Sequence, residues 1–232
     1  MAMKRHILKR SLLLTIPVMM GYVVLGIAFG LLLHSIGYNW VWALGISVFV
    51  FAGSMQFVLV GLLAQQAPLV SVALTTVLVN SRHLFYGLSF IERFKAMGKR
   101  GLYMIFALTD ETYALLCSVG EGGPKEEGDA LYFSIALLHQ IYWVTGSVVG
   151  SLLGSIIRFN ITGIEFAMSA LFSVIVVEQW LEAKNHLAPL IAAATASVML
   201  LVVGPEQFLL PTLIVTVILL FVLRSKLEEE KV

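Results

Sequence analysis

The sequence predicts an all-α polytopic membrane protein with seven to eight transmembrane segments, some of which can be discontinuous. Two observations predict this class. Hydrophobic residues make up 59% of the 232 residues and charged residues only 12%, whereas a soluble domain is about half apolar and about a quarter charged. Apolar stretches of about twenty residues, the length that crosses a hydrocarbon core, recur along the chain. These stretches are 11–36, 40–64, 67–91, 101–119, 131–157, 162–182, 186–203 and 206–224.

The breaks between the stretches are too short for a separate soluble domain, so we expect a single transmembrane domain over 1–232. The net charge of +1 gives no reason to expect nucleic acid as a partner. The lone Cys117 excludes an intramolecular disulfide and a cysteine-based metal site, and no metal site or cofactor is predicted. The basic residues 1–10 lead into an apolar run without a small-residue cleavage site, so this run is interpreted as the first membrane helix.

Basic residues near the segment ends predict the orientation in the membrane. Lys4, Arg5, Lys9 and Arg10 indicate a cytoplasmic N-terminus. The loop 92–100 is the next most basic and also favours the cytoplasm, yet three full crossings would put it outside. We therefore expect that 40–64 or 67–91 is broken or re-entrant, which gives seven crossings. The alternative is eight simple helices, with one loop that breaks the charge rule.

An internal repeat relates two glycine-containing runs. Residues 26–36 read GIAFGLLLHSI and residues 146–156 read GSVVGSLLGSI, identical at six of eleven positions. Gly26, Gly30, Gly146 and Gly150 are candidates for close helix packing. The halves would be about 11–119 and 131–224. With seven crossings the two copies run in opposite directions, which is the inverted-repeat plan of many secondary transporters. The alternative is chance agreement between two glycine motifs.

Polar residues interrupt the apolar segment 67–91. A charge at membrane depth costs at least about 2.5 kcal/mol, so Arg82 must face protein or water. Asn80 and Ser81 can also bond their own backbone and end a helix. The functional interpretation is a polar site at a helix break, and the alternative is a structural ion pair. The candidate residues of this site are Asn80, Arg82, His83 and Tyr86.

Two further polar groups lie inside apolar segments. Asp110 and Glu111 are adjacent carboxylates in 101–119, where desolvation and mutual repulsion favour proton binding. They are candidates for proton coupling together with His83, or partners of Arg82. In 40–64, Gly53 and Ser54 can open the helix while Gln56 offers an amide, since non-helical backbone at this depth requires a cavity or protein around it. Close packing against a neighbouring helix explains the group of Gly53, Ser54 and Gln56 equally well.

These polar groups resemble the AzlC family in their order along the chain. The phrases that carry the resemblance are GYVVLGIAFG at 21–30, VFVFAGSMQF at 48–57, VNSRHLFYGLSF at 79–90 and FALTDETYAL at 106–115. The resemblance implies the large subunit of a branched-chain amino acid exporter in a bacterial inner membrane. It also implies a small AzlD-type membrane subunit as partner, and export driven by the proton gradient.

The predicted function is therefore export of leucine, isoleucine, valine and methionine, with substrate contacts from Gly53, Ser54, Gln56, Asn80, Arg82, His83 and Tyr86. The alternatives are an intramembrane enzyme and a membrane assembly subunit that does not transport. The enzyme is disfavoured because the sequence contains neither an HExxH pair nor a GxSxG motif around Ser54.

Overall fold

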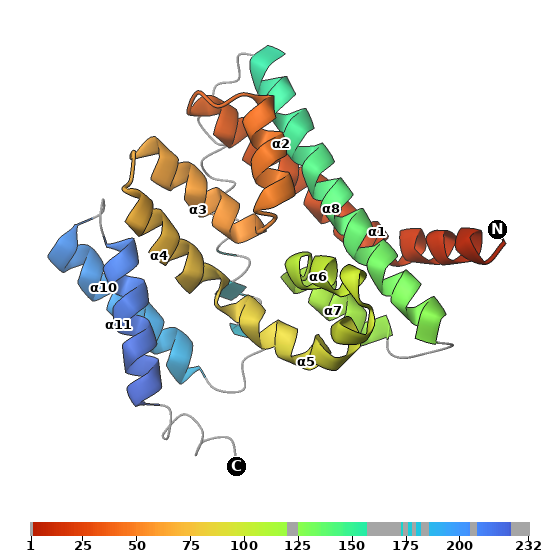
Figure 1. Cartoon of the computed structure of the whole chain (residues 1–232). Coiled ribbons are helices and arrows are strands. Elements are labelled where there is room, and N and C mark those ends of the chain that lie inside the picture. The colour runs from red at the N-terminus through yellow and green to blue at the C-terminus, as the bar shows by residue number, and fades with distance from the viewer. Residues whose placement is uncertain are drawn as a thin grey trace. The chain divides into compact units, whose positions relative to one another are not determined.

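The computed structural model describes residues 2–119, 125–156, 173, 176–177, 180–181, 186–204 and 208–223, except the side chains of 2–5, 82, 84–85, 125–126 and 209–210. All regular secondary structure in these residues is helical (Figure 1), as the sequence predicts. The helices are α1 Ala2–Ser35, α2 Trp40–Phe49, α3 Gly53–Ala64, α4 Leu69–Asn80, α5 Arg82–Ala96, α6 Lys99–Phe106, α7 Asp110–Val119, α8 Lys125–Ile156, α10 Leu187–Val203 and α11 Leu209–Val222. Most of the predicted segment 162–182 lies outside the described residues.

The chain divides into two compact units. The first comprises Met1–Gln65 and Asn80–Glu165, and the second comprises Gln66–Val79 and Phe166–Val232. Within the second unit, α10 packs against α11. The candidate site residues predicted from the sequence all belong to the first unit, which is therefore the unit that concerns function.

Two helices of the first unit are long and apolar enough to cross a membrane: His6–Ser35 within α1 and Glu127–Ile156 within α8. Large apolar side chains of α1 are exposed, among them Leu13 at 60% and Met20 at 66%. A soluble monomer rarely exposes an extended apolar surface, whereas hydrocarbon is a suitable environment for one. The exposed face of α1 thus agrees with a position in the bilayer.

Glycines allow α1 and α8 to pack with their backbones in contact. A Cβ at Gly26 would lie 2.9 Å from the carbonyl oxygen of Trp143, and a Cβ at Gly146 would lie 2.7 Å from that of Val23. Cβ atoms at Gly30 and Gly150 would overlap the carbonyl oxygens of Ser147 and Ile27. The four glycines singled out in the sequence therefore lie where the two longest helices meet.

The glycine contacts also set the relative direction of α1 and α8. Residues 23, 27 and 34 of α1 contact residues 146, 150 and 154 of α8 in that order, so the two helices run parallel. An inverted repeat requires its two copies to run in opposite directions. The expectation of an inverted repeat was wrong for these two runs, whereas the number of crossings, seven or eight, stays a prediction. Parallel spanning helices need an odd number of complete crossings between them.

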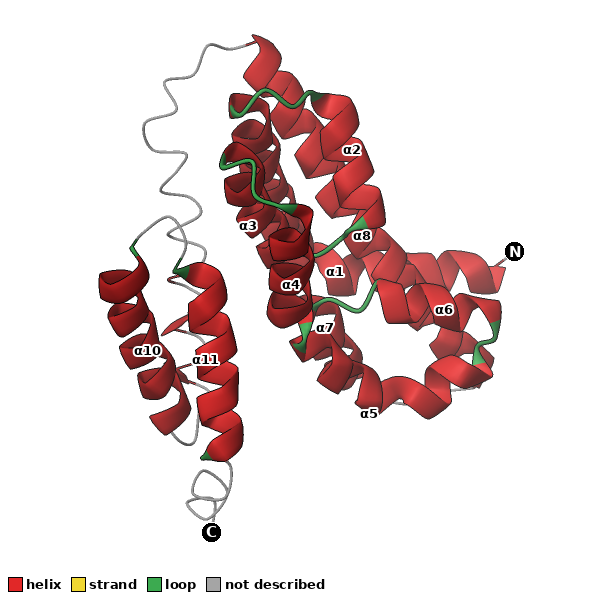
Figure 2. Ribbon diagram, turned by 60° about the vertical axis from the view of Figure 1, so that its left-hand side comes forward, coloured by secondary structure: helices red, strands yellow, loops and turns green. Residues whose placement is uncertain are grey.

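Three apolar segments that precede α8 are each divided into two helices. Segment 40–64 is divided between Phe49 and Gly53, segment 67–91 at Ser81, and segment 101–119 between Phe106 and Asp110. Figure 2 draws the first and third breaks as green loops between red helices. The sequence predicted a break in one of the first two segments, and the structure breaks both.

The break between α2 and α3 has an unusual backbone at Phe51. Its φ is +40°, which is strained for a residue with a side chain and costs on the order of 1–3 kcal/mol. The side chain is 4% exposed and its ring centroid lies 6.2 Å from that of Phe106, the last residue of α6. Burial of this ring offsets the strain and brings the first and third breaks together.

A glutamine of α8 connects the helices around these two breaks. Gln140 Nε2 donates to the carbonyl oxygen of Val48, near the end of α2, at 3.1 Å, and Gln140 Oε1 accepts from the Tyr103 hydroxyl of α6 at 2.7 Å. Carbonyl groups at a helix end have no partner within the helix. The Gln140 side chain, on the neighbouring helix α8, supplies the missing hydrogen-bond donor for Val48. This bond stabilises the interrupted helix in an apolar environment.

Candidate functional site

The break in segment 101–119 places two carboxylates at the start of a helix. Asp110 and Glu111 lie in the middle of the apolar segment 101–119 but form the first turn of α7, because the segment is divided before Asp110. The N-terminal end of a helix carries a partial positive charge that favours negative side chains. The helix break thus supplies an electrostatic reason for two adjacent acids inside an apolar segment.

Glu111 is bonded to a buried tyrosine of α1. The Tyr22 hydroxyl donates to Glu111 Oε2 at 2.6 Å and lies 2.7 Å from Thr109 Oγ1. Tyr22 is 5% exposed, while Glu111 is exposed at its surface. A carboxylate on the exposed side of α7 is therefore hydrogen-bonded directly to a buried tyrosine of α1.

The hydrogen bonds continue from Tyr22 to α8. Thr109 Oγ1 lies 2.8 Å from Thr112 Oγ1, and Thr112 Oγ1 lies 2.8 Å from His139 Nδ1. The Thr112 amide also donates to Thr109 Oγ1 at 3.3 Å, which caps the first turn of α7. Thr112 and His139 are fully buried. One connected set of polar groups thus joins α1, α7 and α8.

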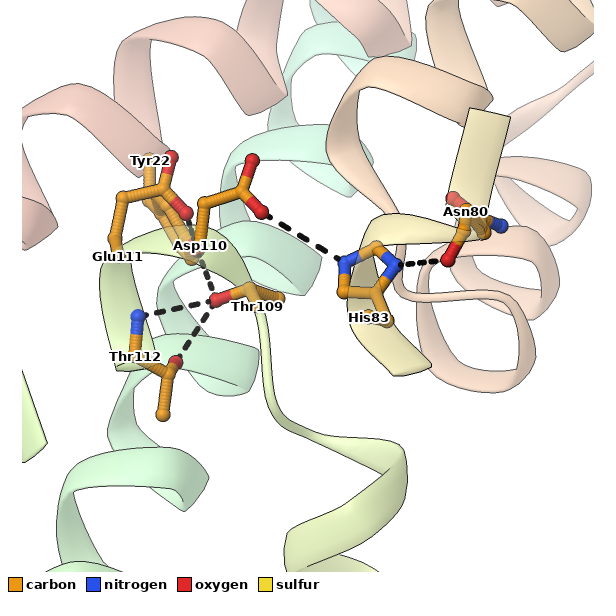
Figure 3. Close-up of polar contacts among 7 residues, drawn as sticks. All are labelled: Tyr22, Asn80, His83, Thr109, Asp110, Glu111 and Thr112. Atoms are coloured by element: carbon orange, nitrogen blue, oxygen red, sulfur yellow. Dashed lines mark hydrogen bonds and ion pairs between the residues drawn. The ribbon is translucent and has the colours of Figure 1, made fainter. Parts of the chain in front are cut away.

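Asp110 turns in another direction, towards the start of α5 (Figure 3). Its Oδ1 lies 4.0 Å from His83 Nε2, and His83 Nδ1 lies 3.2 Å from the carbonyl oxygen of Asn80. The side chains of His83 and Asp110 are 26% and 35% exposed. The second and third breaks therefore meet at a carboxylate and an imidazole that are both partly exposed.

A second polar cluster lies at the break between α2 and α3. Trp143 Nε1 donates to Gln56 Oε1 at 2.9 Å, and Gln56 Nε2 donates to Ser47 Oγ at 3.2 Å. The Gln56 side chain is fully buried, and the Trp143 ring covers Gly53, where a Cβ would lie 3.3 Å from the indole. The ring of Tyr22 meets the indole edge-on at 5.5 Å, so the two clusters adjoin.

Replacing Gln56 with leucine is expected to lower the free energy of unfolding by about 1–3 kcal/mol, because the indole N–H and the Ser47 hydroxyl would be buried without partners. The double variant Gln56→Leu, Trp143→Phe should lose less free energy of unfolding than the sum of the losses of the two single variants. Thermal unfolding in detergent measures both values. The matched control is Gln65→Leu, an exposed glutamine at the end of α3. Additive losses would show that the indole does not depend on Gln56.

The remaining predicted site residues are placed as follows. Tyr86 stacks on Tyr113 with ring centroids 4.6 Å apart and meets the His83 ring edge-on at 5.9 Å. Ser54 lies in the first turn of α3. Arg82 is the first residue of α5, and its side chain is outside the described residues. The structure therefore adds Tyr86 to the surroundings of His83.

Five residues of the site were not among those predicted from the sequence: Tyr22, Thr109, Thr112, His139 and Trp143. His139 and Trp143 are four residues apart on α8, so they share a helix face, which is a signal that the spacing did contain. Tyr22 lies in an apolar run with no polar neighbour. Only its contact across α1 and α7 reveals it.

Comparison with known proteins gives a consistent picture. Residues 17–157 match the family model described as AzlC protein. The chain is 36% identical over 218 residues to the "Branched-chain amino acid transport protein AzlC" of Bacillus subtilis, covering 94% of this chain and 85% of that protein. It is 42% identical over 214 residues to an "Uncharacterized membrane protein" of Helicobacter pylori strain J99, covering 92% and 93%.

A more distant relative is the "Inner membrane protein YgaZ" of Escherichia coli, 27% identical over 156 residues, which are 66% of this chain and 64% of that protein. No solved structure matches. The names of these relatives, membrane proteins and a transport protein, confirm the predictions of a membrane protein that is not an enzyme. The resemblance found in the sequence is likewise confirmed: the chain belongs to the AzlC family.

Proposed function

We propose that the chain is the large subunit of a secondary transporter that exports branched-chain amino acids across the cytoplasmic membrane. Leucine, isoleucine, valine and methionine are the substrates to test. A transport role is supported by the Bacillus subtilis relative, which aligns with 94% of the chain. The observation that carries the proposal is the meeting of Asp110 and His83 at the starts of two interrupted helices.

Interrupted helices suit the binding of a zwitterion. The N-terminal end of a helix attracts an anionic group, and transporters use such ends within the membrane to hold a substrate carboxylate. The starts of α5 and α3 are two ends of this kind. Asp110 at the start of α7 is the group that would bind the substrate amine.

The side chain of the substrate would need an apolar surface beside these polar groups. The aromatic rings of Tyr86 and Tyr113 stack next to His83, and apolar contact with rings contributes about 25 cal/mol per Å² of buried area. A branched or thioether side chain buries enough area to bind, whereas a charged side chain would lose its hydration. This supports apolar amino acids as the substrate class.

The acids and imidazoles support coupling to protons. Glu111 and Asp110 are adjacent, His83 lies 4.0 Å from Asp110, and His139 lies 2.8 Å from the hydroxyl oxygen of Thr112 on the same helix as the two acids. Protonation of such a group can bias a carrier between two states only if the two states bind the proton with different affinity. The Tyr22 contact with Glu111 supports this, because the 2.6 Å hydrogen bond joins the carboxylate of α7 to α1 and would change if the two helices moved relative to each other.

We also propose a small AzlD-type membrane subunit as partner, an inner-membrane location in a bacterium and a cytoplasmic N-terminus. The partner follows from the resemblance to the family, and the N-terminal side follows from Lys4, Arg5, Lys9 and Arg10. Gly53, Ser54, Gln56, Asn80 and Arg82 remain proposed substrate contacts.

Efflux from cells preloaded with labelled amino acids tests the function. With the small subunit present, we expect export of leucine, isoleucine, valine and methionine, but not of lysine or glutamate. Export should increase with an inward proton gradient and stop when an ionophore removes it. Cells that carry the empty vector and cells that lack the small subunit are the controls. Well-folded protein that exports none of the four amino acids with its partner present would exclude this substrate class.

A further inference from the structure

The bonds from Glu111 to His139 form one unbranched chain of side-chain groups that connects two titratable residues. The members are Glu111, Tyr22, Thr109, Thr112 and His139, and the four distances are 2.6, 2.7, 2.8 and 2.8 Å. The three hydroxyl groups between the ends are all in buried residues. Figure 3 shows the part of this chain around Thr109.

The carboxylate at one end determines the direction of every bond. Ionised Glu111 can only accept, so the single Tyr22 proton points to it. Tyr22 oxygen must then accept from Thr109. Since each threonine also has one hydroxyl proton, Thr109 accepts from Thr112, and Thr112 accepts from His139 Nδ1. Neutral His139 is thereby held with its proton on Nδ1 and a lone pair on Nε2.

Protonation of Glu111 reverses the same chain. A protonated carboxyl group donates to Tyr22, each hydroxyl donates to the next, and Thr112 donates to Nδ1. The proton of neutral His139 is then on Nε2. That atom is buried and has no hydrogen-bond partner among the described residues, so in the tautomer with the proton on Nδ1 its lone pair is the group that would accept a proton.

We propose that this chain is a proton relay between His139 Nε2 and Glu111, and the inference rests on the proton coupling proposed above. A proton from water forms the Nε2–H bond while the Nδ1–H bond breaks and its proton passes to Thr112. Each hydroxyl passes its own proton on, and the last O–H bond forms on Glu111. One proton is taken up, one carboxylate is neutralised, and His139 is neutral before and after.

The relay connects the interior of the helix bundle to the proposed amine contact. His139 of α8 is fully buried beside Tyr22 of α1, whereas Glu111 is exposed and adjacent to Asp110 on α7. Among the described residues, His83 of α5 is a further titratable group near these acids, 4.0 Å from Asp110. Neutralising Glu111 removes one negative charge beside the group that would hold the substrate amine. Proton uptake and release of the amine thereby become linked.

The test compares two variants of Thr112 in full-length protein in lipid bilayers, with the small subunit present. Thr112→Val has nearly the same shape and breaks the chain, whereas Thr112→Ser keeps the hydroxyl group. Nitrogen chemical shifts of ¹⁵N-labelled histidine report the tautomer of His139, which is assigned from the spectrum of His139→Asn. We expect the Nδ1–H tautomer in wild type and in Thr112→Ser at high pH, with a change to Nε2–H as Glu111 is protonated. Glu111→Gln should show no such change with pH.

Transport supplies the second measurement. Thr112→Val should lower export driven by a proton gradient about a hundredfold, the lower end of what a positioned proton-transfer group contributes, while Thr112→Ser should stay within about twofold. If Thr112→Val does not fold, Tyr22→Phe breaks the chain at another bond with the ring retained. The relay would be overturned if the wild-type protein exports and these variants export at the same rate. It would also be overturned if the tautomer of His139 stays the same when Glu111 is protonated. A wild-type protein that exports nothing, yet shows the tautomer change, would instead refute the proposed function alone.

Discussion

Replacing Asp110 with asparagine is expected to lower amino acid export by about tenfold to a hundredfold while leaving the amount of folded protein unchanged. The amide has the same shape but cannot attract a substrate ammonium group as an ion. Hydrogen bonds to charged groups contribute roughly 1.5–3 kcal/mol, and each 1.4 kcal/mol is about tenfold in affinity. Initial efflux rates at several internal concentrations measure the effect, which should appear mainly as weaker binding.

The same change at an exposed acid provides the control. Glu92 lies on the exposed part of α5, so Glu92→Gln should export at the wild-type rate. His83→Gln removes the ring 4.0 Å from Asp110 and should reduce export less than Asp110→Asn, because the carboxylate remains. Wild-type export by Asp110→Asn would leave the transporter proposal intact but would assign Asp110 a structural role.

Replacing Gly150 with leucine is expected to prevent stable folding. A Cβ at this position would overlap the carbonyl oxygen of Ile27, and the neighbouring atoms are backbone atoms of α1 that cannot rotate away. Overpacking of a core costs about 1–3 kcal/mol where side chains can adjust, so we expect at least about 3 kcal/mol here. Detergent-solubilised protein should show a lower melting temperature or a strongly reduced yield of monodisperse protein.

Gly21 is the matched control, because it lies on α1 with no atom within 4 Å of an added Cβ. Gly21→Ala should be neutral or stabilising by up to about 1 kcal/mol, since alanine favours a helix more than glycine does. A Gly150→Leu variant as stable as Gly21→Ala would mean that α1 and α8 do not pack through these glycines.

Local sequence signals mark two of the three positions at which the helices break, although a break was expected at only one of the two. Gly53 and Ser54 start α3, and Asn80 and Ser81 end α4 and precede α5. Glycine and residues that bond their own backbone weaken a helix wherever they occur, so these breaks are visible without a partner. The third break, between α6 and α7, was not visible in the sequence, because Ala107 and Leu108 favour a helix.

Contacts between helices explain the third break. Phe106 ends α6 against Phe51, and the Thr109 hydroxyl bonds both Tyr22 and Thr112. These partners come from other helices or depend on the break itself. The packing direction of α1 and α8 was equally hidden, since a glycine motif predicts close approach but is compatible with parallel and antiparallel neighbours.

The sequence by itself determined that the chain is a helical membrane protein of the AzlC family, because composition and motif order are properties of the chain alone. It also selected Asp110, Glu111 and His83, since ionisable groups are costly at membrane depth wherever they point. Only the tertiary structure decided which of them meet: Asp110 with His83, and Glu111 with Tyr22 and, through the threonines, His139. Hydrogen bonds between residues about 90 positions apart depend on distances of 3 Å, and those distances exist only once the helices have packed.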